Sequence, residues 1–473
     1  MDSQYEVFES ARQARDPRFD GRFFVGVRTT GIYCRPVCPV KMPMARNVDF
    51  FQSAAAAMEA GYRPCLRCRP EASPGTPAWM GTSTTVTRAL RLIGDGALDD
   101  EGVGALSDRL GVTSRHLSRL FQKYLGASPI TIAQTRRLQF AKKLLDETNL
   151  SMTDIAFTSG YGSVRRFNDH FRKTYKRTPV SLRKEQTIDQ NNAFIIKLSY
   201  RPPFDFSGIL TFLAMRAIPG VESVGDGEYR RTIFIDGEPG RICVSNDAAQ
   251  NVILCKIEVE NSRALFRIVE KVRRLFDLDA VPQDIQCQLQ KDKLLAKLVR
   301  QNPGQRLPGC WDGFEIAVRA IVGQQISVKG ATTVMGVIAE KYGDQTAYGI
   351  VFPGPAVIAD LDPGELPMPG TRAGAIKLMA QAVLEDELEL GITSDTTQLV
   401  EQLVAIKGIG PWTAQYIAMR ALNDPDVFLQ GDLVLLKVAR AKLGIENERQ
   451  LLMRAEQWRP WRAYAGMHLW RNA

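Results

Sequence analysis

The sequence predicts a multidomain α+β fold, in which mixed α/β segments and all-helical segments alternate along the chain. Its 473 residues exceed what one hydrophobic core can hold, so three or four domains are expected. Two close pairs of cysteines near the start predict a small metal-stabilised α/β module. Apolar residues then recur every three or four positions from about 85 to 185 and again after Cys310, which predicts helices. Strand-like runs lie between 194 and 258.

Composition is that of a soluble globular protein, with 45% hydrophobic and 24% charged residues. The sequence contains no run of about 18 apolar residues, so no membrane span is predicted. The first residues lack the basic and apolar stretches of a secretion signal. We therefore expect a cytoplasmic protein without a membrane partner. Four scattered cysteines show no pairing pattern and are expected to stay reduced: Cys243, Cys255, Cys287 and Cys310.

The net charge of +9 is concentrated in the first half of the chain. Residues 1–188 hold 29 Lys and Arg against 18 Asp and Glu and so carry +11, which leaves −2 for the rest. A basic first half is typical of a nucleic-acid-binding protein. Any contact of the second half with DNA must therefore depend on local geometry rather than on bulk charge.

The pairs Cys34/Cys38 and Cys65/Cys68 form the strongest motif. They can present four thiolates to one ion, and tetrahedral tetrathiolate coordination is typical of Zn²⁺. An inert zinc site that only stabilises a small domain is the alternative. Segments 28–38 (Arg-Thr-Thr-Gly-Ile-Tyr-Cys-Arg-Pro-Val-Cys) and 61–68 (Gly-Tyr-Arg-Pro-Cys-Leu-Arg-Cys) resemble the N-terminal zinc domain of the Ada family of DNA-alkylation sensors. This resemblance covers residues 1–75 and implies that Cys34 also accepts methyl groups from DNA methylphosphotriesters.

Residues 71–77 predict a linker, and residues 82–186 predict an all-α domain with tandem helix-turn-helix units. Residues 103–121 indicate helix, glycine turn and helix, and a second copy follows at 153–171. A plain helical bundle would show the same periodicity. The second helix of each copy offers polar and basic side chains on one face, as a recognition helix does; the expected DNA contacts are Arg115, Arg119, Arg165 and Arg166.

The tandem arrangement, closed by Tyr-Lys-Arg-Thr-Pro at 175–179, resembles the DNA-binding half of AraC-family regulators. The resemblance implies double-stranded promoter DNA and RNA polymerase as partners. A polar linker is predicted at 187–192, followed by an antiparallel sheet domain over 193–285. Its expected strands lie at 194–200, 231–235, 241–245 and 252–258, with helices at 207–217 and 262–276.

Residues 403–420 predict a helix-hairpin-helix, in which Gly408 and Gly410 form the turn. Free backbone N–H groups at such a turn and at the following helix N-terminus suit a DNA phosphate, although many Gly-x-Gly turns merely cap helices. Together with segment 426–432, the hairpin resembles the helix-hairpin-helix DNA glycosylase superfamily. That resemblance implies that Asp432 is the catalytic aspartate.

Four further segments resemble the AlkA family of 3-methyladenine DNA glycosylases II: 200–206, 306–310, 319–328 and 458–464. The resemblance implies a sheet domain like half of the TATA-binding protein over 193–285 and an all-α glycosylase core over 286–473. It also implies a pocket for alkylated purines lined by Trp412, Tyr416 and Trp470, with Gln324 and Gln325 at the DNA. Aromatic faces attract such cationic bases. Periodicity alone would instead place Trp412 and Tyr416 in the core.

Two positions depart from these patterns. Where the lyases of the superfamily carry a nucleophilic lysine, this chain has Trp412, so no Schiff base can form there and a monofunctional enzyme that uses water is implied. Where the AlkA pattern has an apolar wedge beside the flipped base, this chain has Gln325, which can also fill space and form hydrogen bonds.

The sequence thus predicts a fusion: a zinc-dependent methylation sensor and transcription regulator of the bacterial cytoplasm, associated with the nucleoid, joined to a DNA-3-methyladenine glycosylase II. The Pro-Cys-His-Arg motif of the Ada domain that repairs O6-methylguanine does not occur. The alternative is a transcription regulator whose C-terminal half only senses damaged DNA. Asp432 together with three aromatic residues favours the enzyme.

Overall fold

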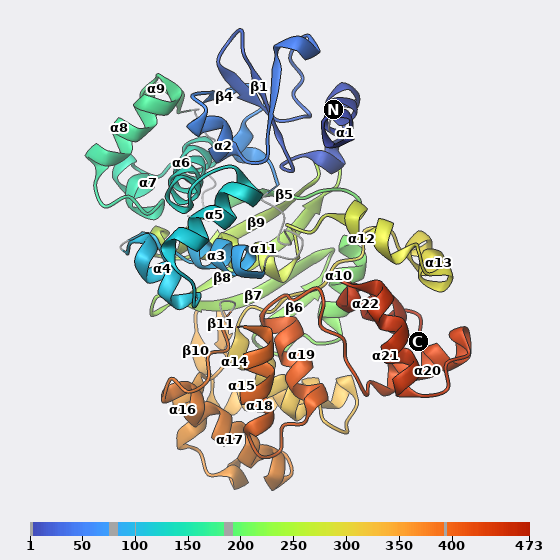
Figure 1. The fold of residues 1–473 in the computed structure, drawn as a ribbon. Helices are drawn as coiled ribbons and strands as arrows, with labels where there is room; N and C mark the ends of the chain where they lie inside the picture. Colours follow the sequence, from blue (N-terminus) through green and yellow to red (C-terminus); the bar gives the residue numbers. More distant parts are fainter. Residues whose placement is uncertain (1–2, 75–83, 100, 184–192, 392–394) are drawn as a thin grey trace. The chain divides into compact units, whose positions relative to one another are not determined.

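The computed structural model describes residues 3–74, 84–99, 101–183, 193–391 and 395–473 (Figure 1). Contacts divide the chain into two compact units, each considered by itself. The first comprises Met1–Pro202, Asp247–Glu270 and Leu278–Ala280, and the second comprises the remaining segments. The division into four domains stays a prediction. The predicted linker at 187–192 and the last three residues of the linker at 71–77 lie outside the described residues.

The N-terminal module of the first unit is a four-stranded sheet in the order β3-β1-β2-β4. Its strands β1 to β3 pair antiparallel, whereas β4 lies parallel to β2. Because parallel strands end at the same edge, Cys34 at the end of β2 and Cys65 directly after β4 meet there. The elements are α1 (Ser3–Ala14), β1 (Phe24–Val27), β2 (Ile32–Cys34), β3 (Val48–Phe51), α2 (Ala54–Glu59) and β4 (Arg63–Pro64).

The two predicted helix-turn-helix units are confirmed: helices α4 and α5 form the first, and α7 and α8 form the second. Each second helix begins at a side-chain cap, Thr113 for α5 and Ser163 for α8, whose hydroxyl accepts the N–H of the third residue along. The long helix α6 contacts α5, α7 and α8, and so joins the two units. The helices are α3 (Thr84–Gly94), α4 (Val103–Arg109), α5 (Ser114–Leu125), α6 (Pro129–Glu147), α7 (Met152–Thr158), α8 (Val164–Tyr175) and α9 (Pro179–Leu182).

The N-terminal module packs on this helical region within the first unit. Ala55 and Ala56 of α2 belong to the core cluster of the first helix-turn-helix unit, and the Ser53 hydroxyl donates to the Leu125 carbonyl at 2.7 Å. Residues 70–72, where a linker was expected to begin, form a 3-10 turn instead. The Glu71 carboxylate there is buried beside Lys142 of α6 at 3.5 Å. The first residues of the predicted linker therefore belong to the packed structure of the module.

The strands predicted between residues 194 and 258 are present, and one further strand in this region was not predicted. In the first unit, β5 (Phe194–Ser199) pairs antiparallel with β9 (Val252–Glu258). In the second unit, β6 (Glu222–Gly225), β7 (Glu228–Ile235) and β8 (Glu238–Asp247) form an antiparallel meander. The missed strand is β6, whose Glu-Ser-Val-Gly sequence has neither alternation nor β-branched enrichment strong enough to identify it.

The second unit is otherwise mostly helical, as predicted from Cys310 onward, except for a short hairpin of β10 (Asp344–Thr346) and β11 (Gly349–Val351). None of the helices in the described segments combines the length and hydropathy needed to span a bilayer. The helices of this unit include α10 (Phe206–Ala214), α14 (Gly313–Val322), α15 (Val328–Tyr342), α17 (Gly370–Leu384), α18 (Thr396–Ala405), α19 (Pro411–Ala421), α20 (Leu433–Leu443) and α22 (Arg462–Trp470). The others are α12 (Pro282–Leu289), α13 (Lys293–Gln301), α16 (Pro355–Asp360) and α21 (Glu448–Ala455), and α11 (Leu265–Leu275) runs from the first unit into the second.

Candidate functional sites: a thiolate cluster and an aromatic cavity

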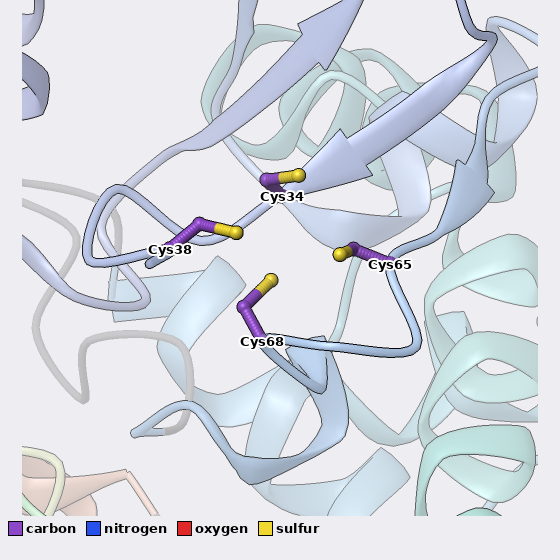
Figure 2. Close-up of side chains that lie close together, drawn as sticks. All are labelled: Cys34, Cys38, Cys65 and Cys68. Carbon is purple, nitrogen blue, oxygen red and sulfur yellow. The ribbon is translucent and has the colours of Figure 1, made fainter. Parts of the chain in front are cut away.

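The four predicted cysteines come together in the first unit. Their sulfur atoms all lie within 4.8 Å of one another and all four side chains are buried. Figure 2 shows the thiols of Cys34, Cys38, Cys65 and Cys68 pointing toward a common centre. Four largely buried sulfur donors at this separation fit one tetrahedrally coordinated Zn²⁺. Among the described residues this is the only cluster of such donors.

Arg35 fixes the loop between the first two cysteines. Its guanidinium pairs with the buried carboxylate of Asp20, with Nε 2.9 Å from Oδ1. Its Nη1 donates to the Cys68 carbonyl at 3.1 Å, and its backbone N–H lies 3.4 Å from the Cys68 sulfur. N–H groups near metal-bound sulfur orient the ligands. The residue next to Cys34 therefore links both cysteine pairs, a role that the sequence did not reveal.

A cavity of about 520 Å³ in the second unit brings together the other predicted residues. Trp412, Tyr416, Asp432 and Trp470 all line it. The rings of Trp412 and Tyr416 are stacked, with centroids 5.4 Å apart and planes 10° from parallel. The Trp470 ring is tilted by 48° to that of Tyr416, at 6.4 Å. The aromatic residues therefore form the wall of a cavity, not only the core that their spacing suggested.

Asp432 is held in place by three N–H donors. Its Oδ1 accepts from the Leu435 backbone at 2.8 Å, which caps α20, and from Trp470 Nε1 at 3.1 Å. Its Oδ2 accepts from Trp412 Nε1 at 3.1 Å. The side chain is only 8% exposed. One carboxylate thus ties two aromatic walls of the cavity to a helix N-terminus, which fixes the position of its negative charge.

Three arginines that sequence reasoning missed lie around Tyr416. Arg420 Nη1 donates to the Tyr416 hydroxyl at 2.9 Å and is itself anchored by the Pro308 and Gly309 carbonyls at 2.7 Å. Burial raises the pKa of Tyr416, but Arg420, Arg216 and Arg319 outweigh it, so the pKa of Tyr416 is lowered. Arg319 lies in one of the motif segments, but nothing in its spacing distinguishes it.

The predicted hairpin is formed by α18, the turn at 406–410 and α19. Gly408 adopts φ +97°, which favours glycine, and a Cβ there would come within 3.0 Å of Ala375. Gly410 caps α19 without a side chain and faces open space. Gln324 donates from Nε2 to the Gly408 carbonyl at 3.0 Å and to Thr413 Oγ1 at 3.2 Å. Its side chain therefore joins the hairpin turn to the first turn of α19. Its contact with DNA stays a prediction.

Gln325 is exposed and has φ +59°, a left-handed conformation that non-glycine residues rarely adopt. Such strained positions cluster at functional sites. Its side chain does not line the cavity, whereas that of the next residue, Ile326, does. The assignment of Gln325 to the DNA therefore stays a prediction.

The four arginines predicted to contact DNA lie exposed on α5 and α8: Arg115, Arg119, Arg165 and Arg166. The opposite faces of the same helices carry the buried residues, including Leu117 and Phe167. Arg119 Nη2 lies 3.0 Å from His116 Nδ1, and Arg165 faces Asp169 at 3.9 Å. Both partners are themselves on the surface, so these weak contacts leave the guanidinium groups accessible.

Comparison with known proteins identifies each part. Three family models match: the metal binding domain of Ada at residues 8–71, a helix-turn-helix domain at 106–185 and the AlkA N-terminal domain at 195–312. A probable bifunctional transcriptional activator/DNA repair enzyme AlkA from Mycobacterium tuberculosis is 42% identical, over 99% of this chain and 97% of its own. DNA-3-methyladenine glycosylase 2 of Escherichia coli is 36% identical over 58% of this chain and 95% of its own.

The bifunctional transcriptional activator/DNA repair enzyme Ada of Escherichia coli is 37% identical over 30% of this chain and 39% of its own. Among solved structures, a 3-methyladenine DNA-glycosylase from Archaeoglobus fulgidus matches 58% of this chain and 96% of its own, with a TM-score of 0.52 and 22% identity. At that identity the match shows the fold of this region alone.

Proposed function

Because this chain belongs to the family of bifunctional transcriptional activator/DNA repair enzymes AlkA, we propose that it acts on alkylated DNA in two ways. It takes methyl groups from DNA methylphosphotriesters onto Cys34 and thereby activates transcription. It also excises alkylated purines such as 3-methyladenine by hydrolysis of the N-glycosidic bond. The observation that carries the proposal is that one chain holds both a buried tetrathiolate cluster and a carboxylate inside an aromatic cavity.

In methyl transfer, the Cys34 sulfur attacks the methyl carbon of the triester. The carbon–oxygen bond breaks, a thioether forms on Cys34, and an ordinary phosphodiester leaves with the bonding electron pair. Bound Zn²⁺ would keep the four cysteines as thiolates at neutral pH. Arg35 orients the loop that carries Cys34. A thioether does not readily release its methyl group, so each molecule accepts one methyl group and the transfer is irreversible.

In base excision, the stacked rings of Trp412 and Tyr416 offer an electron-rich face to a flipped, cationic base. The positive charge of that base makes it a good leaving group without a protonating acid. Asp432 stabilises the positive charge that develops on the sugar, and a water molecule completes the reaction. No lysine is among the described residues that line this cavity. We therefore propose a monofunctional glycosylase, which leaves the DNA strand intact.

The helix-turn-helix region and the hairpin support double-stranded DNA as the partner, both at promoters and at damaged sites. We further propose RNA polymerase as the partner in activation, and the bacterial cytoplasm and nucleoid as the location. The alternative, a regulator whose second half only senses damage, predicts binding of methylated DNA without release of bases.

One experiment tests both activities. Methylated duplex DNA is incubated with the zinc-loaded protein, and the released bases and the methyl groups on the protein are measured together. We expect free 3-methyladenine and one methyl group for each molecule of protein. Methyl transfer without base release would favour the alternative.

We expect methylation of Cys34 to strengthen binding to the promoter site. Converting one thiolate into a thioether removes one negative charge that repels the phosphates, an effect on the order of 1 kcal/mol at low salt. The gain should shrink as salt is added, because ions screen it. Anisotropy titrations of the unmethylated and methylated protein at two salt concentrations measure it. Equal affinities at low salt would contradict the charge mechanism.

We expect Trp412→Ala to weaken the capture of cationic bases by about 10-fold, because stacking and cation–π attraction contribute about 1–2 kcal/mol. Trp412→Phe is the matched variant, since it keeps an aromatic face but loses the N–H that binds Asp432. Binding of DNA that contains 7-methylguanine should therefore fall in the Ala variant and be largely kept in the Phe variant. Equal losses in the two variants would show that Trp412 acts by positioning Asp432 and not by stacking.

A further inference from the structure

A second cavity, of about 190 Å³, lies beside the thiolate cluster in the first unit. Cys34, Cys38 and Cys65 all line it. Much of its remaining wall is apolar: Val25, Val27, Ile32, Val40 and Met42. An organic group in this cavity would lie against Cys34, although the cysteine itself is only 7% exposed.

Three cationic side chains line the same cavity, and two of them are already occupied. Arg12 is buried, binds Glu9 through Nε at 2.8 Å and donates to the Pro43 carbonyl at 3.1 Å. Arg35 binds Asp20 and the Cys68 carbonyl. Lys41 is exposed and has no ion-pair or hydrogen-bond partner among the described residues. It is therefore the cation that is available to a ligand.

The loop that carries Lys41 is held from two sides. Arg12 of α1 binds the Pro43 carbonyl, and Arg15, just beyond α1, donates from Nη2 to the Val40 carbonyl at 3.0 Å. These contacts anchor the chain on both sides of Lys41. A long side chain on an anchored loop can reach into the cavity without ordering the backbone, which lowers the entropy cost of binding.

Resting on the methyl transfer proposed above, we propose that this cavity binds the methylphosphotriester and that Lys41 is the residue that binds its phosphoryl oxygen. A triester carries no net charge, so its methyl and sugar groups suit the apolar wall. An ordinary phosphodiester is an anion, and its transfer into such a wall costs free energy. The cavity thereby distinguishes the damaged phosphate from the many undamaged ones around it.

Lys41 also stabilises the transition state of methyl transfer. As the Cys34 sulfur forms its bond to the methyl carbon, the carbon–oxygen bond breaks and negative charge develops on the departing phosphate. An ammonium group at the phosphoryl oxygen gains attraction as that charge grows, so it binds the transition state more tightly than the neutral triester.

The test compares three variants of the full-length, zinc-loaded protein: Lys41→Met, Lys41→Arg and Arg46→Met. Arg46 is an exposed cation of the same module that does not line the cavity. Its replacement removes the same positive charge as Lys41→Met but leaves the cavity unchanged. Two methyl donors are used: a duplex oligonucleotide with one methylphosphotriester, and iodomethane, which has no phosphate. The single-turnover rate with each donor and the zinc content are measured.

We expect Lys41→Met to lower the rate with the oligonucleotide by about 10- to 100-fold, while the rate with iodomethane and the zinc content stay at the wild-type level. Lys41→Arg should restore most of the rate, and Arg46→Met should resemble wild type. Equal losses in Lys41→Met and Arg46→Met would overturn the proposal in favour of bulk charge. A parallel loss with iodomethane would show that Lys41 acts on the thiolate cluster. Wild-type protein that takes no methyl group from the oligonucleotide would overturn the methyl transfer itself, and the cavity assignment with it.

Discussion

We expect Asp432→Asn to abolish the release of 3-methyladenine and 7-methylguanine, with a fall in the single-turnover rate of at least about 10³-fold. The amide has nearly the shape of the carboxylate, but it cannot supply the negative charge that stabilises positive charge on the sugar. Release of labelled bases from methylated duplex DNA in excess enzyme measures the effect. Full activity in this variant would show that another group carries the reaction.

The contacts of Asp432 define the controls for this variant. The amide oxygen can keep the hydrogen bonds from the Leu435 backbone and Trp470, but the amide nitrogen then faces the N–H of Trp412. Some loss of stability, about 1–3 kcal/mol, is therefore expected, and thermal unfolding and DNA binding should be measured beside activity. Asp386→Asn, the same change at an exposed position of the same unit, should leave all three unchanged.

We expect Cys34 to carry the transferred methyl group, and Cys34→Ser to abolish the transfer completely. The serine hydroxyl is a far weaker nucleophile than a thiolate, so we expect transfer at this position to be lost even though Cys38 and Cys65 line the same cavity. After reaction with methylphosphotriester DNA, peptide mapping of the wild-type protein should place one added methyl group on Cys34. A label on Cys38, Cys65 or Cys68 would contradict the assignment.

The mapping in wild-type protein is needed because Cys34→Ser also changes a predicted zinc ligand. Cys287→Ser is the matched control, since it removes an exposed thiol outside the cluster. It should transfer methyl at the wild-type rate and keep its zinc. Base excision should be unaffected in both variants, because Asp432 and its aromatic neighbours lie in the other compact unit.

The sequence predicted the local arrangement of residues well where that arrangement depends on residue identity at a fixed spacing, and the roles of the site residues stay predictions. The cysteine pairs, the two helix-turn-helix units and the hairpin glycines are local patterns, and their geometry follows from the backbone nearby. The convergence of Trp412, Asp432 and Trp470 was expected only through the family resemblance, because it joins segments far apart in the chain.

Other features could not be predicted, because they depend on packing between distant segments. The hydrogen bond from the Gln324 amide to the Gly408 carbonyl is one such feature, and the expected contact of Gln324 with DNA stays a prediction. The arginines around Tyr416 look like ordinary helix residues in the sequence. The choice of Cys34 as methyl acceptor also came from the resemblance, since three of the four cysteines line the same cavity. Which thiolate reacts depends on access and orientation, and spacing does not encode these.

The continuous helix α6 contacts helices of both helix-turn-helix units. Its 19 residues form one uninterrupted helix about 28 Å long, which therefore fixes the spacing between the two units. Regulators that pair two subunits set this spacing through a dimer interface, which can adapt. Here one uninterrupted helix sets it, so if both units bind one duplex, we expect one base pair inserted between their sites to turn the second site away from α8. The DNA, and not the protein, would then have to twist or bend.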